Sequence, residues 1–178
     1  MQLSDSMVWP TKEVMDIREL LLPEFKFEMK KIRATLERVP ETKLEYSPHT
    51  KSMPIGKLAA HLARIPYFIV AIIELPEFDS ATSGQKPLVM ESTVQLLQAF
   101  DEYADKGRKA LATADDSTLL QPWKLLSKGV TILQGTRYQM VRSFVLNHAI
   151  HHRAQLGVYL RLNDVPVPSV YGPSADES

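Results

Sequence analysis

Four stretches of the sequence carry apolar residues at helical spacing, and they constrain the possible folds more than any other feature. They run from Pro23 to about Arg38, from Ser52 to Glu74, from Glu91 to Thr113 and from Arg137 to Leu162. In the first stretch, apolar residues recur at steps of four, three and four, on one face of a helix: Phe25, Met29, Ile32 and Leu36. A helix with one apolar face must bury it against another element. Four such segments predict an all-α fold built as a four-helix bundle.

Prolines and hydroxyl residues indicate where these helices begin and bend. Pro23 suits an early helical position, because proline lacks the N–H that the first turn leaves unbonded. Ser52 is a candidate N-cap of the second helix, with Pro54 in its first turn. Pro66 lies inside that helix and predicts a bend. Upstream, residues Thr11 to Leu22 are a candidate short extra helix capped by Thr11.

The connections between the four segments are long for a simple up-and-down bundle, and they favour an up-down-down-up order with crossover connections. Before the last helix, PWKLLSKGVTIL is typical of two short strands joined by a three-residue loop, Ser127 to Gly129, with Gly129 in the left-handed conformation. Residues 163–178 contain three prolines and a glycine, and we expect an extended Pro-rich tail. The length predicts a single domain over residues 1–178.

Composition excludes several classes of function. Lys plus Arg and Asp plus Glu both number 21, and no basic stripe is visible, so we expect no nucleic-acid partner. The absence of cysteine removes disulfides, thiolate metal ligands and a cysteine nucleophile. MQLSDSMVWP does not resemble a secretory signal, and the longest apolar run, Tyr67 to Ile73, is too short to span a bilayer. We therefore expect a cytoplasmic protein without a membrane partner.

Three of the five histidines crowd into NHAIHHRAQL on the fourth predicted helix. On a helical wheel, His148 falls in the apolar arc, with His152 about 40° to one side and His151 about 60° to the other. Arg153 falls on the opposite, polar arc with three other residues: Arg142, Asn147 and Arg161. Two or three imidazoles therefore point toward the bundle interior, where an unsatisfied polar ring is costly.

The spacing of these histidines predicts a metal site. His148 and His152 are four residues apart, about 6 Å along the helix, so two imidazoles can chelate one ion. His61 is the remaining histidine on an apolar helical face, and it is the candidate third ligand. Neutral imidazoles bind a borderline divalent ion without thiolates, and three of them leave a coordination position open.

Other interpretations of the histidines stay open. Each ring can be a core residue that is hydrogen-bonded to a carbonyl, hydroxyl or carboxylate. His151 can replace His152 as the partner of His148, support the site from behind, or face a neighbouring subunit. His49 lies in a predicted loop, and we expect a surface position or a role in a local turn, with a place at the rim of a pocket as the alternative. Motifs for a zinc protease (HExxH), a nucleophile elbow, a dinucleotide fold, a P-loop and a ferritin-like di-iron centre are absent.

At these residues the sequence resembles a known family. LNHAIHHRAQLGVYLRLNDVPVPSVYGPSADE (Leu146 to Glu177) is similar to the C-terminal signature of the DinB-like superfamily of damage-inducible proteins, and KLEYSPHTKSMPIGKLAAHLARIP (Lys43 to Pro66) to its second-helix region. The resemblance implies a crossover four-helix bundle, a homodimer, and a divalent ion held by His61, His148 and His152. The family pattern has glycine where this chain has Ala154, which puts local packing of that helix in question.

The resemblance also implies candidate functions. Relatives include bacillithiol and mycothiol S-transferases, so one reading is an enzyme in which zinc or nickel (or iron, cobalt or manganese) activates a small thiol toward an electrophilic or ester substrate. A metal-dependent hydrolase, a non-catalytic small-ligand-binding stress-response module and a purely helical interaction protein are the alternatives. Gln155 and Tyr159 follow His152 on the same arc, where they can line the substrate or simply the core. The sequence assigns no catalytic residue beyond the ligands.

Overall fold

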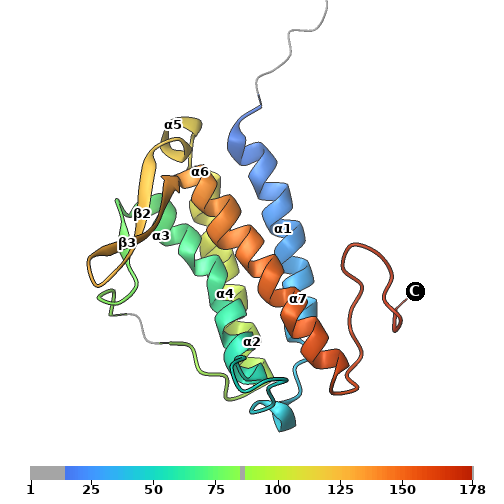
Figure 1. Cartoon of the computed structure of the whole chain (residues 1–178). Coiled ribbons are helices and arrows are strands. Elements are labelled where there is room, and N and C mark those ends of the chain that lie inside the picture. Colours follow the sequence, from blue (N-terminus) through green and yellow to red (C-terminus); the bar gives the residue numbers. More distant parts are fainter. Residues whose placement is uncertain (1–14, 85–86, 178) are drawn as a thin grey trace, which may run out of the picture.

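The computed structural model describes residues 15–84 and 87–177, and this part of the chain is mostly helical (Figure 1). The α-helices are α1 (Ile17–Leu36), α2 (Ile55–Arg64), α3 (Phe68–Glu74), α4 (Thr93–Thr113), α5 (Asp116–Leu119), α6 (Arg137–Met140) and α7 (His148–Arg161). Short 3-10 turns span Glu41–Lys43 and Ile65–Tyr67, and a π-helical stretch, Val141–Asn147, joins α6 to α7. The strands are β1 (Phe78–Asp79), β2 (Pro122–Ser127) and β3 (Val130–Thr136).

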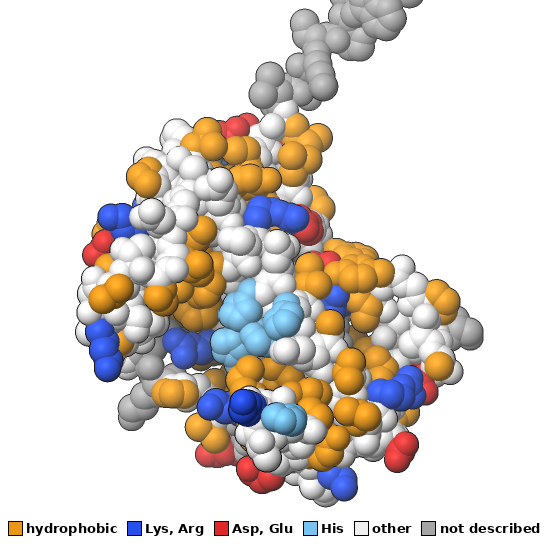
Figure 2. Space-filling model, in the orientation of Figure 1, with side chains coloured by type: hydrophobic (Ala, Val, Ile, Leu, Met, Phe, Trp, Pro, Cys, Tyr) orange, Lys and Arg blue, Asp and Glu red, His pale blue; other side chains and the backbone are white. Residues whose placement is uncertain are grey.

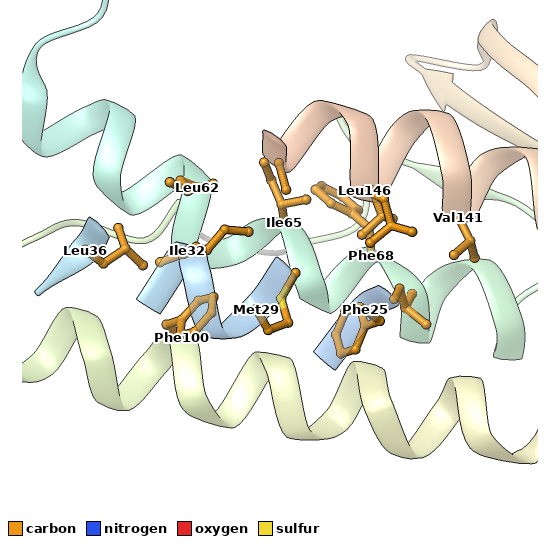
Figure 3. Packing of buried hydrophobic residues seen from close by; sticks show 14 of the residues in the cluster. Phe25, Met29, Ile32, Leu36, Leu62, Ile65, Phe68, Phe100, Val141 and Leu146 are labelled. Atoms are coloured by element: carbon orange, nitrogen blue, oxygen red, sulfur yellow. The ribbon is translucent and has the colours of Figure 1, made fainter. Parts of the chain in front are cut away.

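The long helices share one apolar core. α1 packs against α4 and α7, and α2 packs against the same two helices. Figure 1 shows α1 and α7 running toward one end of the molecule and α2, α3 and α4 running toward the other. Figure 3 shows core side chains of these elements turned toward one another, among them Phe25, Ile32, Leu62, Phe100 and Leu146. The helical architecture predicted from the apolar periodicity is confirmed, whereas the crossover four-helix bundle remains a prediction about topology.

The first helix begins earlier than predicted. α1 starts at Ile17, because the Glu19 carboxylate accepts the Asp16 N–H at 3.1 Å and so caps the first turn. Pro23 lies inside the helix with its ring exposed, instead of at the beginning. The predicted separate helix from Thr11 to Leu22 is therefore wrong for residues 17–22, which belong to α1, and its proposed cap, Thr11, lies outside the described residues.

The second segment bends where the sequence predicts a bend. The 3-10 turn at Ile65–Tyr67 contains Pro66 and separates α2 from α3. A Cβ on Gly107 of α4 would lie 2.6 Å from the Pro66 carbonyl oxygen, so only glycine lets α4 pass this bend. The predicted N-cap, Ser52, is wrong: Pro54 precedes the first turn, and the Ser52 N–H donates to the His49 carbonyl in the loop.

Helix length and composition alone would allow the segment Ile55–Glu74 to cross a membrane. Its most apolar 18-residue window, however, is 72% buried inside the molecule. Burial of this kind is typical of the core helix of a folded domain, because a membrane-spanning helix would expose its apolar side chains to lipid. We therefore assign the segment to the protein core.

The predicted hairpin is present, but its loop is shorter. β2 and β3 pair antiparallel, with Leu125 opposite Leu133, and two residues, Lys128 and Gly129, connect them. Both have positive φ, 52° and 76°, as a two-residue hairpin turn requires, so the predicted three-residue loop is wrong. β1 adds a parallel partner to β2, and the Asp79 carboxylate accepts the Gly129 N–H at 2.7 Å. The fold is therefore mostly helical with a three-stranded sheet, and the purely all-α class is corrected.

The tail returns along α1 and α7 without forming a helix. The Asp176 carboxylate pairs with Arg161 of α7 at 2.5 Å, and the Glu177 carboxylate pairs with Arg38 at 2.6 Å. Figure 1 shows the described part of the tail beside α1 and α7. Residues 165–177 contain neither helix nor strand, and the extended Pro-rich tail stays a prediction.

Candidate metal centre

The structure brings together three imidazoles from two helices. His61 lies near the end of α2, whereas His148 and His152 occupy the first two turns of α7. The Nε2 atom of His148 is 3.2 Å from that of His61 and 2.8 Å from that of His152. Ligand atoms of all three residues lie within 4.8 Å of one another. Nitrogens on one tetrahedral zinc ion are about 3.3 Å apart, so the three rings are placed to share an ion.

Two of the three rings are hydrogen-bonded through Nδ1 to carbonyl oxygens. The His148 Nδ1–H donates to the Phe144 carbonyl at 3.2 Å, and the His152 Nδ1–H donates to the Gln155 side-chain oxygen at 2.8 Å. A neutral imidazole that donates from Nδ1 presents a lone pair at Nε2. With both rings donating from Nδ1, the two Nε2 atoms that face each other both present lone pairs, and this arrangement suits a cation between them.

Burial favours the neutral form of all three imidazoles. Burial lowers the pKa of His61 from 6.5 to about 4, with a further lowering by the neighbouring rings of His152 and His148. Burial likewise lowers the pKa of His148 and of His152. All three imidazoles are therefore neutral near pH 7, which is the form that binds a divalent cation.

One side of the cluster reaches the surface. His61 and His148 are half-buried, whereas His152 is 8% exposed. Figure 2 shows histidine side chains grouped on the face of the molecule, with hydrophobic and Lys or Arg side chains at the border of the group. An ion held by the three rings would therefore keep a position accessible to a small molecule, as in catalytic rather than structural zinc sites.

The helix that carries two of the rings is irregular just before them. The π-helical stretch Val141–Asn147 ends where α7 begins at His148. Such π segments are frequent at functional sites, because the extra residue per turn shifts the side chains that follow. A wheel with 100° per residue therefore does not hold from Val141 to His148, although it holds within α7, where His148 and His152 both lie.

The other predicted site residues lie around this cluster in different ways. The Gln155 side-chain oxygen accepts the His152 Nδ1–H, so Gln155 orients a candidate ligand from the side opposite its Nε2 atom. Tyr159 is 8% exposed and packs edge-on against Tyr46, with ring centroids 6.4 Å apart. A role of Gln155 or Tyr159 in lining the substrate stays a prediction. His151 is exposed on α7, with its ring centroid 5.0 Å from that of His152.

Two further sequence expectations concern residues outside the cluster. His49 is exposed in the loop before α2, and its Nδ1 accepts the Lys51 N–H at 3.1 Å, which agrees with a role in a local turn. Ala154 is exposed on α7. It lines a groove between α7 and the returning tail, together with Gly157 and Val170.

Sequence reasoning missed a buried ionic network beside the site. Arg153 is 4% exposed, although the wheel placed it on the polar arc. Its guanidinium donates to the Glu28 carboxylate at 2.5 Å and to the Tyr171 hydroxyl at 2.7 Å, and this hydroxyl donates to Glu28 at 2.8 Å. Arg153 is buried because α1 and the returning tail supply these partners. A helical wheel describes a single helix and includes neither α1 nor the tail. The periodicity of the sequence therefore could not have predicted the network.

A second buried arginine joins the start of the last helical segment to α3. Arg137 is 8% exposed, and its guanidinium donates to the carbonyls of Ile73 at 3.0 Å and Leu75 at 2.9 Å. A cation at a helix C-terminus satisfies carbonyls that lack partners within the helix. Arg137 thus fixes one end of the α2–α3 segment against the segment that carries His148 and His152.

Fold and site together define a mostly helical protein with a candidate metal centre of three imidazoles. The DinB family's sequence model matches residues 7–178, so the chain belongs to the DinB family. A DinB-like protein from Bacillus cereus ATCC 10987 superposes with a TM-score of 0.68 at 19% identity, covering 88% of this chain and 98% of that one. The DinB-like protein YjoA from Bacillus subtilis gives 0.66 at 18%, covering 86% and 99%. No curated protein matches the sequence.

Proposed function

We propose that the protein binds one divalent metal ion through His61, His148 and His152 and uses it for chemistry on small molecules. The observation that carries the proposal is the convergence of the three ring nitrogens, two of which face each other with lone pairs because carbonyl groups accept the protons on the opposite nitrogens. Zinc and nickel suit three neutral imidazoles, and iron, cobalt and manganese are further candidates. The crossover four-helix bundle implied by the family would be the scaffold.

We propose thiol transfer as the reaction. A bound divalent ion would lower the pKa of a thiol or water molecule in the open position. The chain has no cysteine, so the thiol would come from a low-molecular-weight cosubstrate such as bacillithiol, mycothiol or glutathione. In the reaction the thiol would release its proton to solvent and its sulfur would bond to an electrophilic carbon. The bond from that carbon to the leaving group would break, and the leaving group would depart with the electron pair. Gln155 and the Phe144 carbonyl would keep two of the rings oriented throughout.

Two measurements test this proposal in order. Metal analysis of protein purified without a histidine tag should find close to one equivalent of zinc or nickel, or uptake of one equivalent when the ion is added. A protein that holds no ion and takes up none would refute the metal site. The loaded and metal-free forms are then assayed with each thiol against electrophiles and esters. We expect thiol consumption only with the loaded form.

The alternatives give different results in the same assay. Ester cleavage by the loaded protein without any thiol would favour the metal-dependent hydrolase, with water in place of the sulfur. Inactivity of the loaded protein with every thiol and ester would favour a non-catalytic ligand-binding module. Homodimer formation, a cytoplasmic location and the absence of nucleic-acid and membrane partners stay predictions, of which dimerisation is checked by light scattering after size-exclusion chromatography.

A further inference from the structure

The solvent side of α7 carries exposed apolar side chains. Ala154, Val158 and Leu162, the last directly after the helix, are all exposed and recur every four residues, so they follow one stripe along it. Val158 is 58% exposed and Leu162 is 56% exposed. Arg161 is the one exposed Lys, Arg, Asp or Glu side chain of α7, and its guanidinium pairs with Asp176 of the tail at 2.5 Å. The stripe therefore offers water apolar groups and no free charge.

The solvent side of α4 has the opposite character. Lys106 pairs with Glu102 at 2.5 Å, and Lys109 pairs with Asp105 at 2.6 Å, all within the same helix. Ion pairs of this kind are typical of a helix face that stays in water. An exposed apolar patch, in contrast, is typical of a surface that binds a partner. The two helices of one molecule thus differ in what their outer faces are suited to meet.

A groove runs beside the apolar stripe. It lies between α7 and the returning tail, has a volume of about 390 Å³, and is bordered by Val158. Ala154 and Gly157 line it on the helix side, and Val167 and Val170 line it on the tail side. The same face of the molecule therefore presents an exposed apolar side chain and, next to it, a hollow with apolar walls.

The apolar surface continues from the groove to α1. Tyr171 of the tail lines the groove and stacks on Phe27 of α1, with ring centroids 6.2 Å apart and planes 18° apart. Both rings are exposed. In Figure 1, α7 lies at the front of the molecule with the tail beside it, so the stripe, the groove and the two rings border one another. The surface is thus broader than one helix.

The occupant that fits this surface is a second copy of the chain. A face that carries both a projecting side chain and a hollow can pair with itself about a twofold axis, so that each copy fills the hollow of the other. Cores of protein interfaces are depleted in charge, and the charge of Arg161 is already paired within its own chain. The chain also has equal numbers of basic and acidic residues, 21 of each, so two copies do not repel each other over long distances.

We infer that the solvent side of α7, the groove beside it and the pair of Phe27 and Tyr171 form the interface with a second copy of this chain. Val158 of each copy enters the groove of the other. A stable dimer buries about 800 Å² on each partner, which is why the interface includes the tail and α1 as well as α7. The inference assigns a surface to the predicted homodimer, and it rests on neither the metal ion nor the reaction.

The test is size-exclusion chromatography with light scattering on the full-length, untagged protein over a range of concentrations. The wild type should have twice the mass of one chain. Val158→Lys and Leu162→Lys each place an ammonium group without a partner in the interface, and each should raise the dissociation constant of the dimer more than about tenfold. Val94→Lys is the matched control, because Val94 is 64% exposed on α4, and it should leave the dimer intact. Circular dichroism shows whether each variant is folded.

The outcomes separate this interface from the other proposals. A wild type that stays a single chain at every concentration would refute both the interface and the homodimer. A dimer that persists in Val158→Lys and Leu162→Lys as in the wild type would refute the interface alone, and so would equal dissociation of Val94→Lys. Zinc uptake by the same samples decides the metal proposal separately, because the interface needs no ion.

Discussion

At the scale of single residues, the candidate centre depends on which ring nitrogen carries the proton. His148→Ala removes the ring whose Nε2 atom lies 3.2 Å from that of His61 and 2.8 Å from that of His152. We expect the metal content to fall from about one equivalent to less than about a tenth, because two neutral imidazoles hold a divalent ion much more weakly than three. His151→Ala is the matched control, since it removes an exposed imidazole from the same helix. Equal metal content in both variants would contradict the assignment of His148.

Gln155 provides a test of a residue that orients a ligand without touching the ion. Its side-chain oxygen accepts the His152 Nδ1–H, so Gln155→Leu removes the group that fixes this tautomer. We expect a 10- to 100-fold loss of zinc affinity, the usual effect of removing such a partner. Gln155→Glu keeps the acceptor and should bind zinc at least as well as the wild type. Competition with a chromophoric chelator measures both, and unchanged affinity of Gln155→Leu would exclude the orienting role.

The lowered histidine pKa values make the metal-free protein sensitive to acid. The pKa of His61 is about 4 in the folded chain, against 6.5 for an unperturbed histidine. Between these pH values the unfolded chain binds a proton that the folded chain does not, so the free energy of unfolding decreases as the pH falls. We expect His61→Gln to flatten this decrease, measured by urea unfolding of metal-free protein between pH 7 and 4.5. His49→Gln, in an exposed loop, is the control, and equal slopes for the two variants would argue against the burial of His61.

At the scale of elements, the spacing of apolar residues predicted which face of a helix is buried. The stripe Phe25, Met29, Ile32 and Leu36 is buried as its spacing predicts. Boundaries were less predictable: Pro23 lies inside α1 because the Asp16–Glu19 cap starts the helix earlier. β1 could not be predicted, because two residues, Phe78 and Asp79, show no period and pair only through β2. Local periodicity thus predicts which segments are helical. Contacts outside the periodic stripe determine where a helix begins and where a two-residue strand forms.

The network of Glu28, Arg153 and Tyr171 joins α1, α7 and the tail, and its disruption should destabilise all three. Glu28→Ala leaves the Arg153 guanidinium, which is 4% exposed, without its carboxylate partner. We expect a loss of about 3–5 kcal/mol in the free energy of unfolding, as is typical when one member of a buried ion pair is removed. Tyr171→Phe removes only the hydroxyl and should cost about 1 kcal/mol.

Urea denaturation measures both variants, with Glu37→Ala as the control. Glu37 also pairs with an arginine of α1, Arg33, but both side chains are about 40% exposed, so we expect a change of less than about 1 kcal/mol. A loss for Glu28→Ala no greater than that for Glu37→Ala would show that the buried network does not hold the tail and the two helices together.

At the scale of the whole molecule, the site depends on contacts between distant segments. His148 and His152 were predictable as a pair because both lie in one helix with regular spacing. The approach of His61, 87 residues away from His148, depends on the packing of α2 against α7, and the sequence offered only its apolar helical face and the family resemblance.

Because the three imidazoles come from two helices that are far apart in sequence, metal binding should stabilise the entire fold. An ion that binds only the folded chain adds about 2.7 kcal/mol when its free concentration is 100 times its dissociation constant. For a chain of 178 residues, about 2–4 °C of melting temperature corresponds to each kcal/mol, so zinc should raise the melting temperature by about 5–10 °C. Differential scanning calorimetry measures this shift. His61→Ala, which leaves the pair on α7 intact, should lose most of it, and a full shift in that variant would mean that the ion binds α7 alone and does not join the two helices.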